Sequence, residues 1–417
     1  MDHVETNVDK SRSPLVIPFA ILLLVATVGG LATIFALLHG GTTPSNGTGD
    51  SVPEVSSVSA TTFSKAGPMG VGESTLRLPD GSNVEVWYPA SPDGYHGKQA
   101  SYDVLDYVPA SITSAFPALK SEPYASGAIR DVRVADGRYP LVVFSHGFTG
   151  FNTQSSFLTS HLASWGFVVA SPEHGDRDLT GVLQQFLSGQ PMTQIQSKDV
   201  SQLKATITLM EDESTNTSSR FDGHIDMTRI GAVGHSAGGS AVEKLAVVDS
   251  RVDTFIGLAG ASFGAFGQSS GIGSKAPMVP GMLMYGTLDK VVEPDSMISA
   301  YNKLHQPKRL IGLSSSGHLV FADICKLAPK QGGLIGAAEK AGLPVPDTLK
   351  KLGTDGCFAP SMSVTEAWPA INQAVTAQLR WTLGFDESQA GLTGLEAAFN
   401  GIVTQNTTAN KVASPAR

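Results

Sequence analysis

The sequence predicts an α/β fold, in which a doubly wound, mostly parallel sheet follows an antiparallel N-terminal hairpin and is preceded by one transmembrane helix. Three patterns carry this prediction: an uncharged apolar run near the amino terminus, two alternating segments around a turn, and short apolar segments separated by helical ones. The chain has 417 residues, of which 41% are hydrophobic and 16% charged. This composition is too apolar for a disordered chain, and the length suffices to bury a large core.

Charge and cysteine content exclude several classes of protein. The formal net charge is −8 and the sequence has no basic run, which argues against nucleic acid as the main partner. The two cysteines are too few for a scaffold built on disulfides. The sequence also lacks a Cys-x-x-Cys motif, which excludes a zinc ribbon. We expect neither a metal nor a cofactor, and the sequence leaves the oligomeric state open.

Residues 14–38 contain no charged side chain. As a helix they would be about 37 Å long, enough to cross a hydrocarbon core of about 30 Å. Lys10 and Arg12 precede the run and the next basic residue is Lys65, so the positive-inside rule keeps residues 1–13 in the cytoplasm and exports the rest. We expect a signal-anchor in the cell membrane. The alternative is a cleaved signal peptide and a secreted protein.

The remainder divides by composition. Residues 39–62 are rich in Gly, Thr, Ser and Pro and are expected to form a flexible stalk. Residues 63–385 form the expected folded body, and residues 386–417 a mostly polar tail with one short helix.

Strand and helix patterns alternate within the body. Thr75–Tyr88 is two alternating runs around Pro79-Asp80-Gly81, which predicts a hairpin. Unbroken apolar runs then predict strands that are buried on both faces of a parallel sheet, at 141–144, 167–170, 230–233, 255–258, 282–285 and 310–313. Helical patterns lie between several of them, as at 157–164 and 237–248.

A candidate nucleophile lies between a predicted strand and a predicted helix. Gly234-His235-Ser236-Ala237-Gly238 matches G-x-S-x-G, the sharp turn that exposes a serine hydroxyl above a sheet edge. The match alone is weak evidence, because the Gly-rich chain contains a second one around Ser269. Only Ser236 has the required strand and helix on its two sides, so we predict that Ser236 is the nucleophile and Ser269 a loop residue.

A serine nucleophile needs a base and an orienting carboxylate. In this type of fold the acid and then the histidine follow the serine, each after a later strand. Asp289 follows the predicted strand 282–285, with Glu293 and Asp295 as rival acids. His318 follows 310–313, and its rival, His305, precedes that strand.

Two backbone N–H groups are expected to bind the oxyanion. One belongs to Ala237, the residue after the nucleophile, and the other to the loop after an earlier strand. Ser145-His146-Gly147-Phe148 supplies that loop, with Phe148 as the donor and His146 in a structural role.

These motifs resemble one branch of the α/β-hydrolases, which contains the platelet-activating-factor acetylhydrolases and, as relatives, dienelactone hydrolases and bacterial polyester hydrolases. The resemblance covers roughly residues 75–385. It rests on Ser145–Phe148, Leu162–Ala170, Glu173–Asp178, Gly234–Gly239 and Gly317–Asp323. It implies a serine esterase with a Ser–Asp–His triad and no metal.

The expected function is therefore that of a serine carboxylic-ester hydrolase, of esterase or lipase type, which acts through an acyl-enzyme on a small-molecule or lipid ester outside the cytoplasm. Two alternatives stay open: a membrane-tethered acyltransferase, and a binding protein that keeps a hydrolase shell without turnover.

Two segments and two cysteines complete the prediction. Leu179–Met210 and Ala261–Val279 are candidates for a lid or acyl-binding wall, and ordinary helix packing is equally open for the first. Export favours a disulfide between Cys325 and Cys357, and two free thiols are the alternative.

Overall fold

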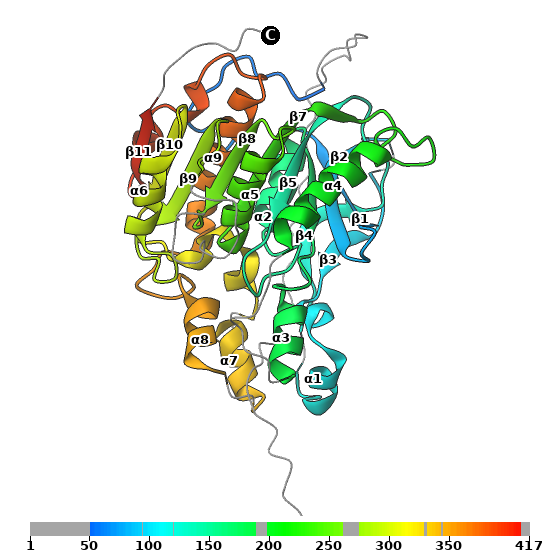
Figure 1. Cartoon of the computed structure of the whole chain (residues 1–417), viewed down its shortest axis with the longest axis vertical. Coiled ribbons are helices and arrows are strands. Elements are labelled where there is room, and N and C mark those ends of the chain that lie inside the picture. Colours follow the sequence, from blue (N-terminus) through cyan, green and yellow to red (C-terminus); the bar gives the residue numbers. More distant parts are fainter. Residues whose placement is uncertain are drawn as a thin grey trace, which may run out of the picture.

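A computed structural model describes residues 51–93, 95–119, 121–188, 198–261, 275–328, 332–342 and 345–409. In this part of the chain, eleven strands form one sheet in the order β11-β10-β9-β8-β7-β5-β6-β2-β1-β4-β3 (Figure 1). The strands are β1 (Gly70–Arg77), β2 (Asn83–Ala90), β3 (Gln99–Tyr102), β4 (Tyr124–Arg130), β5 (Tyr139–Ser145), β6 (Val168–Pro172), β7 (Ile225–His235), β8 (Thr254–Leu258), β9 (Gly281–Gly286), β10 (Lys308–Leu313) and β11 (Val403–Ala409).

The centre of the sheet is parallel, and towards its two ends the strand pairs are antiparallel except for the parallel pair of β1 with β4. Strands β6, β5, β7, β8, β9 and β10 run parallel. The six apolar runs predicted as buried strands lie in them, except that β6 begins at Val168, one residue after the start of the run 167–170. The predicted hairpin is also present, because β1 pairs antiparallel with β2 along its full length. Strand β2 then joins the hairpin antiparallel to β6. The sheet is consistent with the α/β-hydrolase fold predicted from the sequence.

Helices cover both faces of this sheet, because its central strands are apolar on both faces. In β5, Val142 and Phe144 face one hydrophobic cluster, whereas Leu141 and Val143 face the other. The helices on the first face are α2 (Ser156–Ser164) and α9 (Val364–Thr382), and those on the second are α4 (Asp199–Glu213), α5 (Ala237–Val248) and α6 (Pro294–Lys303). This three-layer arrangement is the doubly wound architecture.

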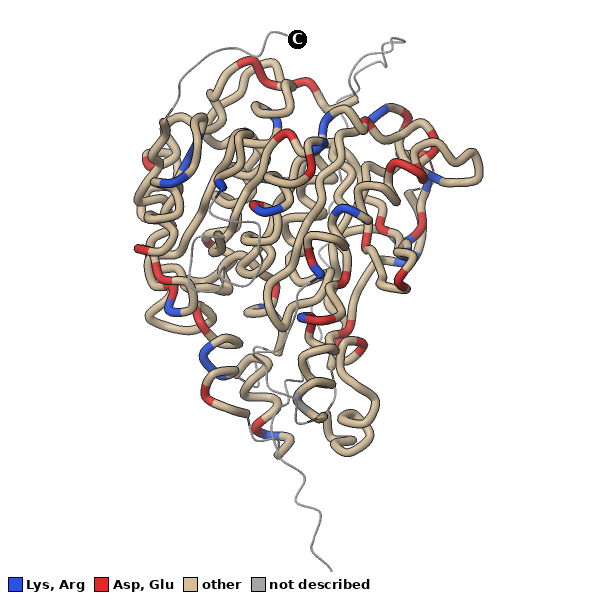
Figure 2. The backbone as a smooth tube through the Cα atoms, viewed as in Figure 1, with Lys and Arg blue, Asp and Glu red and all other residues tan. Residues whose placement is uncertain are grey.

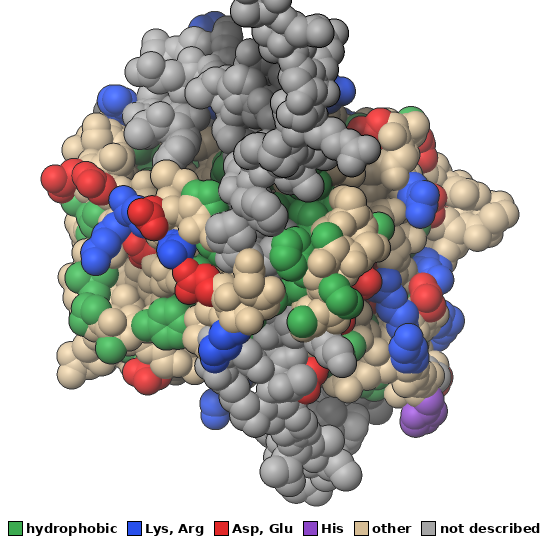
Figure 3. Space-filling view, turned by 90° about the horizontal axis from the view of Figure 1, so that it is seen from below, with side chains coloured by type: hydrophobic (Ala, Val, Ile, Leu, Met, Phe, Trp, Pro, Cys, Tyr) green, Lys and Arg blue, Asp and Glu red, His purple; other side chains and the backbone are tan. Residues whose placement is uncertain are grey.

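A third cluster lies beyond the carboxyl ends of the parallel strands. It forms the lower end of the molecule in Figure 1, which we call the cap. The cap consists of η1 (Val104–Tyr107), α1 (Ala110–Ala115), α3 (Leu179–Leu187), α7 (Gly333–Lys340) and α8 (Asp347–Thr354). Helices α1 and α3 contain no charged residue, so that part of the cap is uncharged in Figure 2. Seen from below, hydrophobic side chains reach the surface there (Figure 3), and the exposed large ones include Leu187 and Phe358.

The stalk prediction is wrong for residues 51–62, which pack on the body. The Val52 side chain is buried, and Val55, Val58 and Ala60 pack against the first core cluster. The Pro53 carbonyl accepts a hydrogen bond from Arg380 Nη1 at 3.1 Å. Small apolar residues spaced among Ser and Thr are enough to dock this segment, although its composition is typical of a linker.

The polar tail predicted for residues 386–417 is likewise wrong over the described part. Leu392 and Leu395 are fully buried, in η6 (Ala390–Leu392) and α10 (Leu395–Ala398). Strand β11 then pairs antiparallel with β10 and becomes an edge of the sheet. A strand at an edge needs few apolar residues, which explains why its Thr- and Asn-rich sequence gave no strand signal.

The expected transmembrane segment, 14–38, lies outside the described residues. Within them, no helix combines the length and the apolar character that a membrane crossing requires.

Candidate active site

Ser236 lies at the sharp turn that the sequence predicted. Strand β7 ends at His235, helix α5 begins at Ala237, and Ser236 between them has φ 56° and ψ −119°. A non-glycine residue at positive φ is strained, and such strain is characteristic of functional sites. The turn is held by the Ser236 N–H, which donates to the Leu258 carbonyl at 2.8 Å. Gly238 has to be glycine, because a Cβ there would overlap the backbone of Ser145.

Asp289 and His318 form a hydrogen-bonded pair. His318 Nδ1 is 2.9 Å from Asp289 Oδ2, and both side chains are almost completely buried. The other carboxylate oxygen, Oδ1, accepts the N–H groups of Val291 and Val292, each at 2.8 Å. Both carboxylate oxygens are therefore used, which fixes the carboxylate plane and with it the direction of the imidazole.

The structure brings Ser236 and His318 together on one cavity. His318 Nε2 is buried and has no hydrogen-bond partner among the described residues, and no bond joins it to the Ser236 hydroxyl. Hydrogen bonds of this kind are often long before substrate binds. The rival residues are arranged differently: Asp295 lies in the first turn of α6 and is exposed, and Glu293 is the residue before that helix.

The predicted oxyanion donors lie at the same cavity. Phe148 lines it directly, and Ala237 is the residue next to Ser236 at the start of α5. Within the described residues, no acceptor is bound to either backbone N–H. Two free donors beside a candidate nucleophile are the arrangement that binds a tetrahedral oxyanion.

Arg177 supports the loop that carries Phe148, a role that the sequence analysis did not identify. Its Nη1 donates to the carbonyls of His146 (2.6 Å) and Gly147 (3.0 Å), and its Nη2 donates to Ser145 Oγ (2.9 Å). Its own carbonyl accepts the N–H of Thr149 at 2.9 Å. Arg177 lies in the Glu173–Asp178 motif. The sequence therefore contained a signal for this residue, but its hydrogen-bond partners are visible only in the folded structure.

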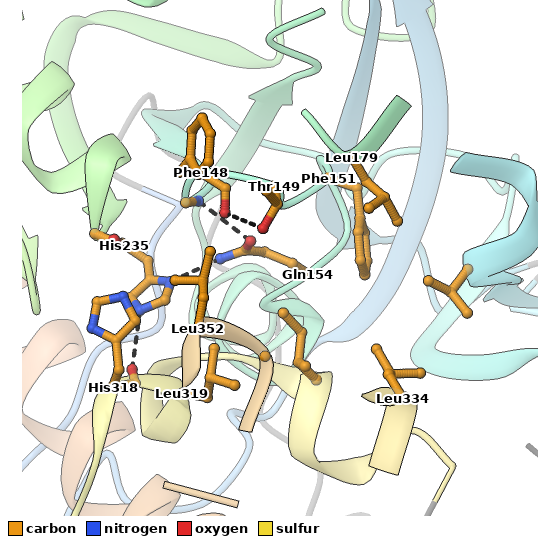
Figure 4. A pocket seen from close by; sticks show the side chains of 15 residues that line it. Phe148, Thr149, Phe151, Gln154, Leu179, His235, His318, Leu319, Leu334 and Leu352 are labelled. Atoms are coloured by element: carbon orange, nitrogen blue, oxygen red, sulfur yellow. Dashed lines mark hydrogen bonds between the residues drawn. The ribbon is translucent and has the colours of Figure 1, made fainter. Parts of the chain in front are cut away.

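Gln154 and His235 form a second link that the sequence did not suggest. The Gly147 N–H donates to Gln154 Oε1 at 3.3 Å, Gln154 Nε2 lies 3.0 Å from His235 Nδ1, and His235 Nε2 lies 3.1 Å from the His318 carbonyl. Figure 4 shows these contacts among residues that line the cavity. Burial, and secondarily the neighbouring His318, lower the pKa of His235 well below its usual value. A neutral His235 can therefore accept from Gln154 and donate to His318.

The cavity lies between the sheet edge and the cap and has a volume of about 40 Å³. Its floor is polar, and its walls are apolar side chains from η1, α3, α7 and α8. Those that the cap contributes are Val104, Leu179, Leu334 and Leu352 (Figure 4 labels the last three).

The expected lid segments are only partly described. Leu179 and Leu183 of α3 are buried in the cap cluster, and α4 packs on the sheet. Residues 189–197 and 262–274 lie outside the described part. Cys325 and Cys357 form a disulfide bond, so the alternative of two free thiols does not hold. The described residues contain no cluster of side chains suited to hold a metal ion.

Comparisons with known proteins agree with the resemblance seen in the motifs. Residues 80–220 match the family model of platelet-activating factor acetylhydrolase, isoform II. A curated relative, the platelet-activating factor acetylhydrolase of Canis lupus familiaris, is 34% identical over 101 residues, which is 24% of this chain and 20% of the relative. The resemblance to this branch of the α/β-hydrolases is thereby confirmed. A solved ferulic acid esterase from Streptomyces cinnamoneus has a TM-score of 0.49 and 21% identity, covering 76% of this chain and 90% of its own.

The matches cover only part of this chain and of the curated relative. The chain spans about a fifth of the curated relative's length. The family match includes the Ser145–Phe148 loop and Arg177 but ends before Ser236, Asp289 and His318.

Proposed function

We propose that the protein is a serine carboxylic-ester hydrolase in which Ser236 is the nucleophile, His318 the general base and Asp289 the carboxylate that orients the base. The observation that carries the proposal is the 2.9 Å contact between Asp289 and His318, with the other imidazole nitrogen unpartnered beside the cavity that Ser236 lines. The name of the matched family, an acetylhydrolase, supports the same reaction class.

The proposed reaction uses these groups in order. Ser236 Oγ attacks the ester carbonyl while His318 Nε2 takes the hydroxyl proton, and Asp289 stabilises the imidazolium. The carbonyl oxygen becomes an oxyanion and accepts the N–H groups of Phe148 and Ala237. The intermediate collapses, the C–O bond to the alcohol breaks, and His318 returns the proton to the departing alcohol. Water then attacks the acyl-enzyme by the same route and releases the acid.

The cavity favours an ester with a small acyl group. Its volume of about 40 Å³ and its leucine-rich walls suit a short apolar chain such as acetyl. We expect kcat/KM to be at least about tenfold higher for p-nitrophenyl acetate than for the octanoate, since the longer chain has to displace cap side chains and each misfit costs roughly 1–3 kcal/mol. Equal rates for the two esters would contradict this account of the cavity.

The proposal extends to location: residues 14–38 anchor the protein in the cell membrane, and the body lies outside the cytoplasm. The absence of charge from that run supports the anchor. The Cys325–Cys357 disulfide supports an oxidising compartment for the body. The membrane fraction of cells is alkylated with and without reductant, and mass mapping then shows whether Cys325 and Cys357 are disulfide-bonded in the cell. This measurement tests the compartment.

The catalytic assignment is tested by p-nitrophenyl acetate hydrolysis in two matched serine variants. Ser236→Ala removes the proposed nucleophile, and we expect kcat to fall by at least about 10³-fold. Ser269→Ala alters the other Gly-x-Ser-x-Gly match and should keep the wild-type rate. Comparable activity in Ser236→Ala and wild type would overturn the proposal.

A further inference from the structure

A short segment at the end of α8 contacts both loops that carry the proposed acid and base. Asp355 Oδ1 accepts the N–H of His318 at 2.8 Å, and Asp355 Oδ2 accepts the N–H of Lys290 at 3.1 Å. Lys290 is the residue directly after Asp289. A single carboxylate therefore joins the backbone of the histidine loop to the backbone of the acid loop. The proposed reaction gives this carboxylate no role.

The same segment fits closely against the histidine loop. The Asp355 carbonyl accepts the N–H of Leu319 at 2.9 Å, which adds a second hydrogen bond between this segment and the histidine loop. Gly317 packs so closely that a Cβ there would overlap Asp355 Oδ1, and Gly356 has φ +93°. The two backbones are thus in direct contact, and a shift of Asp355 would be transmitted to His318.

Helix stability does not explain an aspartate at this position. Asp355 is the C-cap of α8, and its N–H bonds to the Lys351 carbonyl. The carboxyl end of a helix carries a partial negative charge, so a carboxylate there is unfavourable for the helix itself. Its hydrogen bonds to His318 and Lys290 compensate for this unfavourable position.

A covalent bond holds the segment in place. Cys357, two positions after Asp355, forms the disulfide with Cys325, which lies in η4 (Asp323–Lys326) shortly after His318. Helices α7 and α8 of the cap lie between the two cysteines. The disulfide therefore ties the end of α8 to the stretch that continues from the histidine loop.

We propose that Asp355 is a positioning residue, which fixes the separation between the loops of Asp289 and His318, and that the Cys325–Cys357 disulfide keeps Asp355 in register. This inference rests on the proposed function of the same site. The imidazole depends on two loops being held at the correct distance, and a misplacement of about 1 Å can cost about 10²-fold in rate.

Three variants test the role of Asp355. Asp355→Ala removes both acceptors, Asp355→Asn keeps one acceptor oxygen, and Asp347→Ala is the matched control, because Asp347 is an exposed acid in the first turn of the same helix. Each is assayed for kcat and KM on p-nitrophenyl acetate. The rate of Ser236 modification by a fluorophosphonate is measured as well, since it reports the nucleophile without requiring an acyl pocket.

We expect Asp355→Ala to lower kcat and the fluorophosphonate rate together, by about 10- to 100-fold, with KM within about twofold of wild type. Asp355→Asn should fall between wild type and Asp355→Ala, and Asp347→Ala should match wild type. If Asp355→Ala does not fold, Asp355→Asn decides, and a loss of about threefold or more in both rates supports the inference. Rates within about twofold of wild type, or a loss confined to KM, would overturn it.

The disulfide is tested in a double-mutant cycle with Cys325→Ser/Cys357→Ser. Without the bond, Asp355 is already displaced part of the time, so Asp355→Ala should cost less in that background than in wild type. If the effects of Asp355→Ala and of the disulfide removal on the rate are fully additive, the disulfide does not keep Asp355 in register. A wild-type protein inert toward both probes would instead contradict the proposed function, which separates the two failures.

Discussion

Replacing Asp289 with asparagine tests the proposed triad through the tautomer of His318. Asp289 Oδ1 accepts two backbone N–H groups, from Val291 and Val292, whereas Oδ2 faces His318 Nδ1. In Asp289→Asn, the single amide oxygen has to occupy the Oδ1 position to keep those two acceptor contacts. The amide NH₂ then faces His318 Nδ1, which has to become an acceptor.

The consequence is an imidazole with its proton on the wrong nitrogen. If Nδ1 accepts, Nε2 carries the hydrogen and cannot take the Ser236 proton. In a triad of this kind, the same substitution lowers kcat by about 10⁴-fold, or about 5.4 kcal/mol. The fold should be little affected, because the replacement is isosteric and the contacts to Val291 and Val292 are retained.

The assay is p-nitrophenyl acetate turnover, with thermal unfolding measured on the same samples. Asp295→Asn is the matched control, because Asp295 is an exposed rival acid at the start of α6, and it should keep the wild-type rate. An Asp289→Asn variant that retains more than about a tenth of wild-type kcat would refute the assignment of Asp289. Loss of activity in Asp295→Asn alone would point to the rival acid.

Three further predictions address the loop, the buried acid and the carboxyl-terminal segment. Arg177→Met should lower kcat by about 10²-fold, because the Phe148 donor loses its support, and steady-state kinetics measure this. Burial raises the pKa of Asp323 from 3.8 to about 7, so its contribution to stability is complete below 3.8 and is lost as the pH rises through 7. From about pH 5 to about pH 8 the wild-type free energy of unfolding should fall by about 2–3 kcal/mol more than that of Asp323→Asn, measured by urea denaturation, and equal falls would contradict this sign. Leu395→Ala should cost about 2–5 kcal/mol in the same assay if residues 386–409 belong to the body, and no change would contradict that packing.

The central fold was predictable because its signals are local. Every predicted strand from 141–144 to 310–313 is a run of apolar residues that the sheet buries on both faces, so hydrophobic pattern and tertiary structure agree. The candidate site residues were predictable from the same pattern. Ser236, Asp289 and His318 each stand just after a predicted strand, and parallel strands place their carboxyl ends at one sheet edge.

The features that the sequence did not predict depend on contacts between segments that are distant along the chain. The side chains of Arg177, Gln154 and Asp355 form hydrogen bonds with backbone groups of the loops at the candidate site, and a backbone acceptor or donor leaves no mark in the sequence. The edge strand β11 and the docked residues 51–62 were missed for a related reason. Each is stabilised by a few contacts to an already formed surface, which composition alone does not reveal.

The docking of residues 51–62 also determines from which direction the body is tethered, if residues 14–38 lie in a bilayer as proposed. Ser51 accepts the N–H of Arg138, just before β5, whereas the cavity lies beyond the opposite end of that strand. On that proposal, the attachment point and the cavity lie at opposite ends of β5, so the cavity lies on the side of the body that is farther from the bilayer.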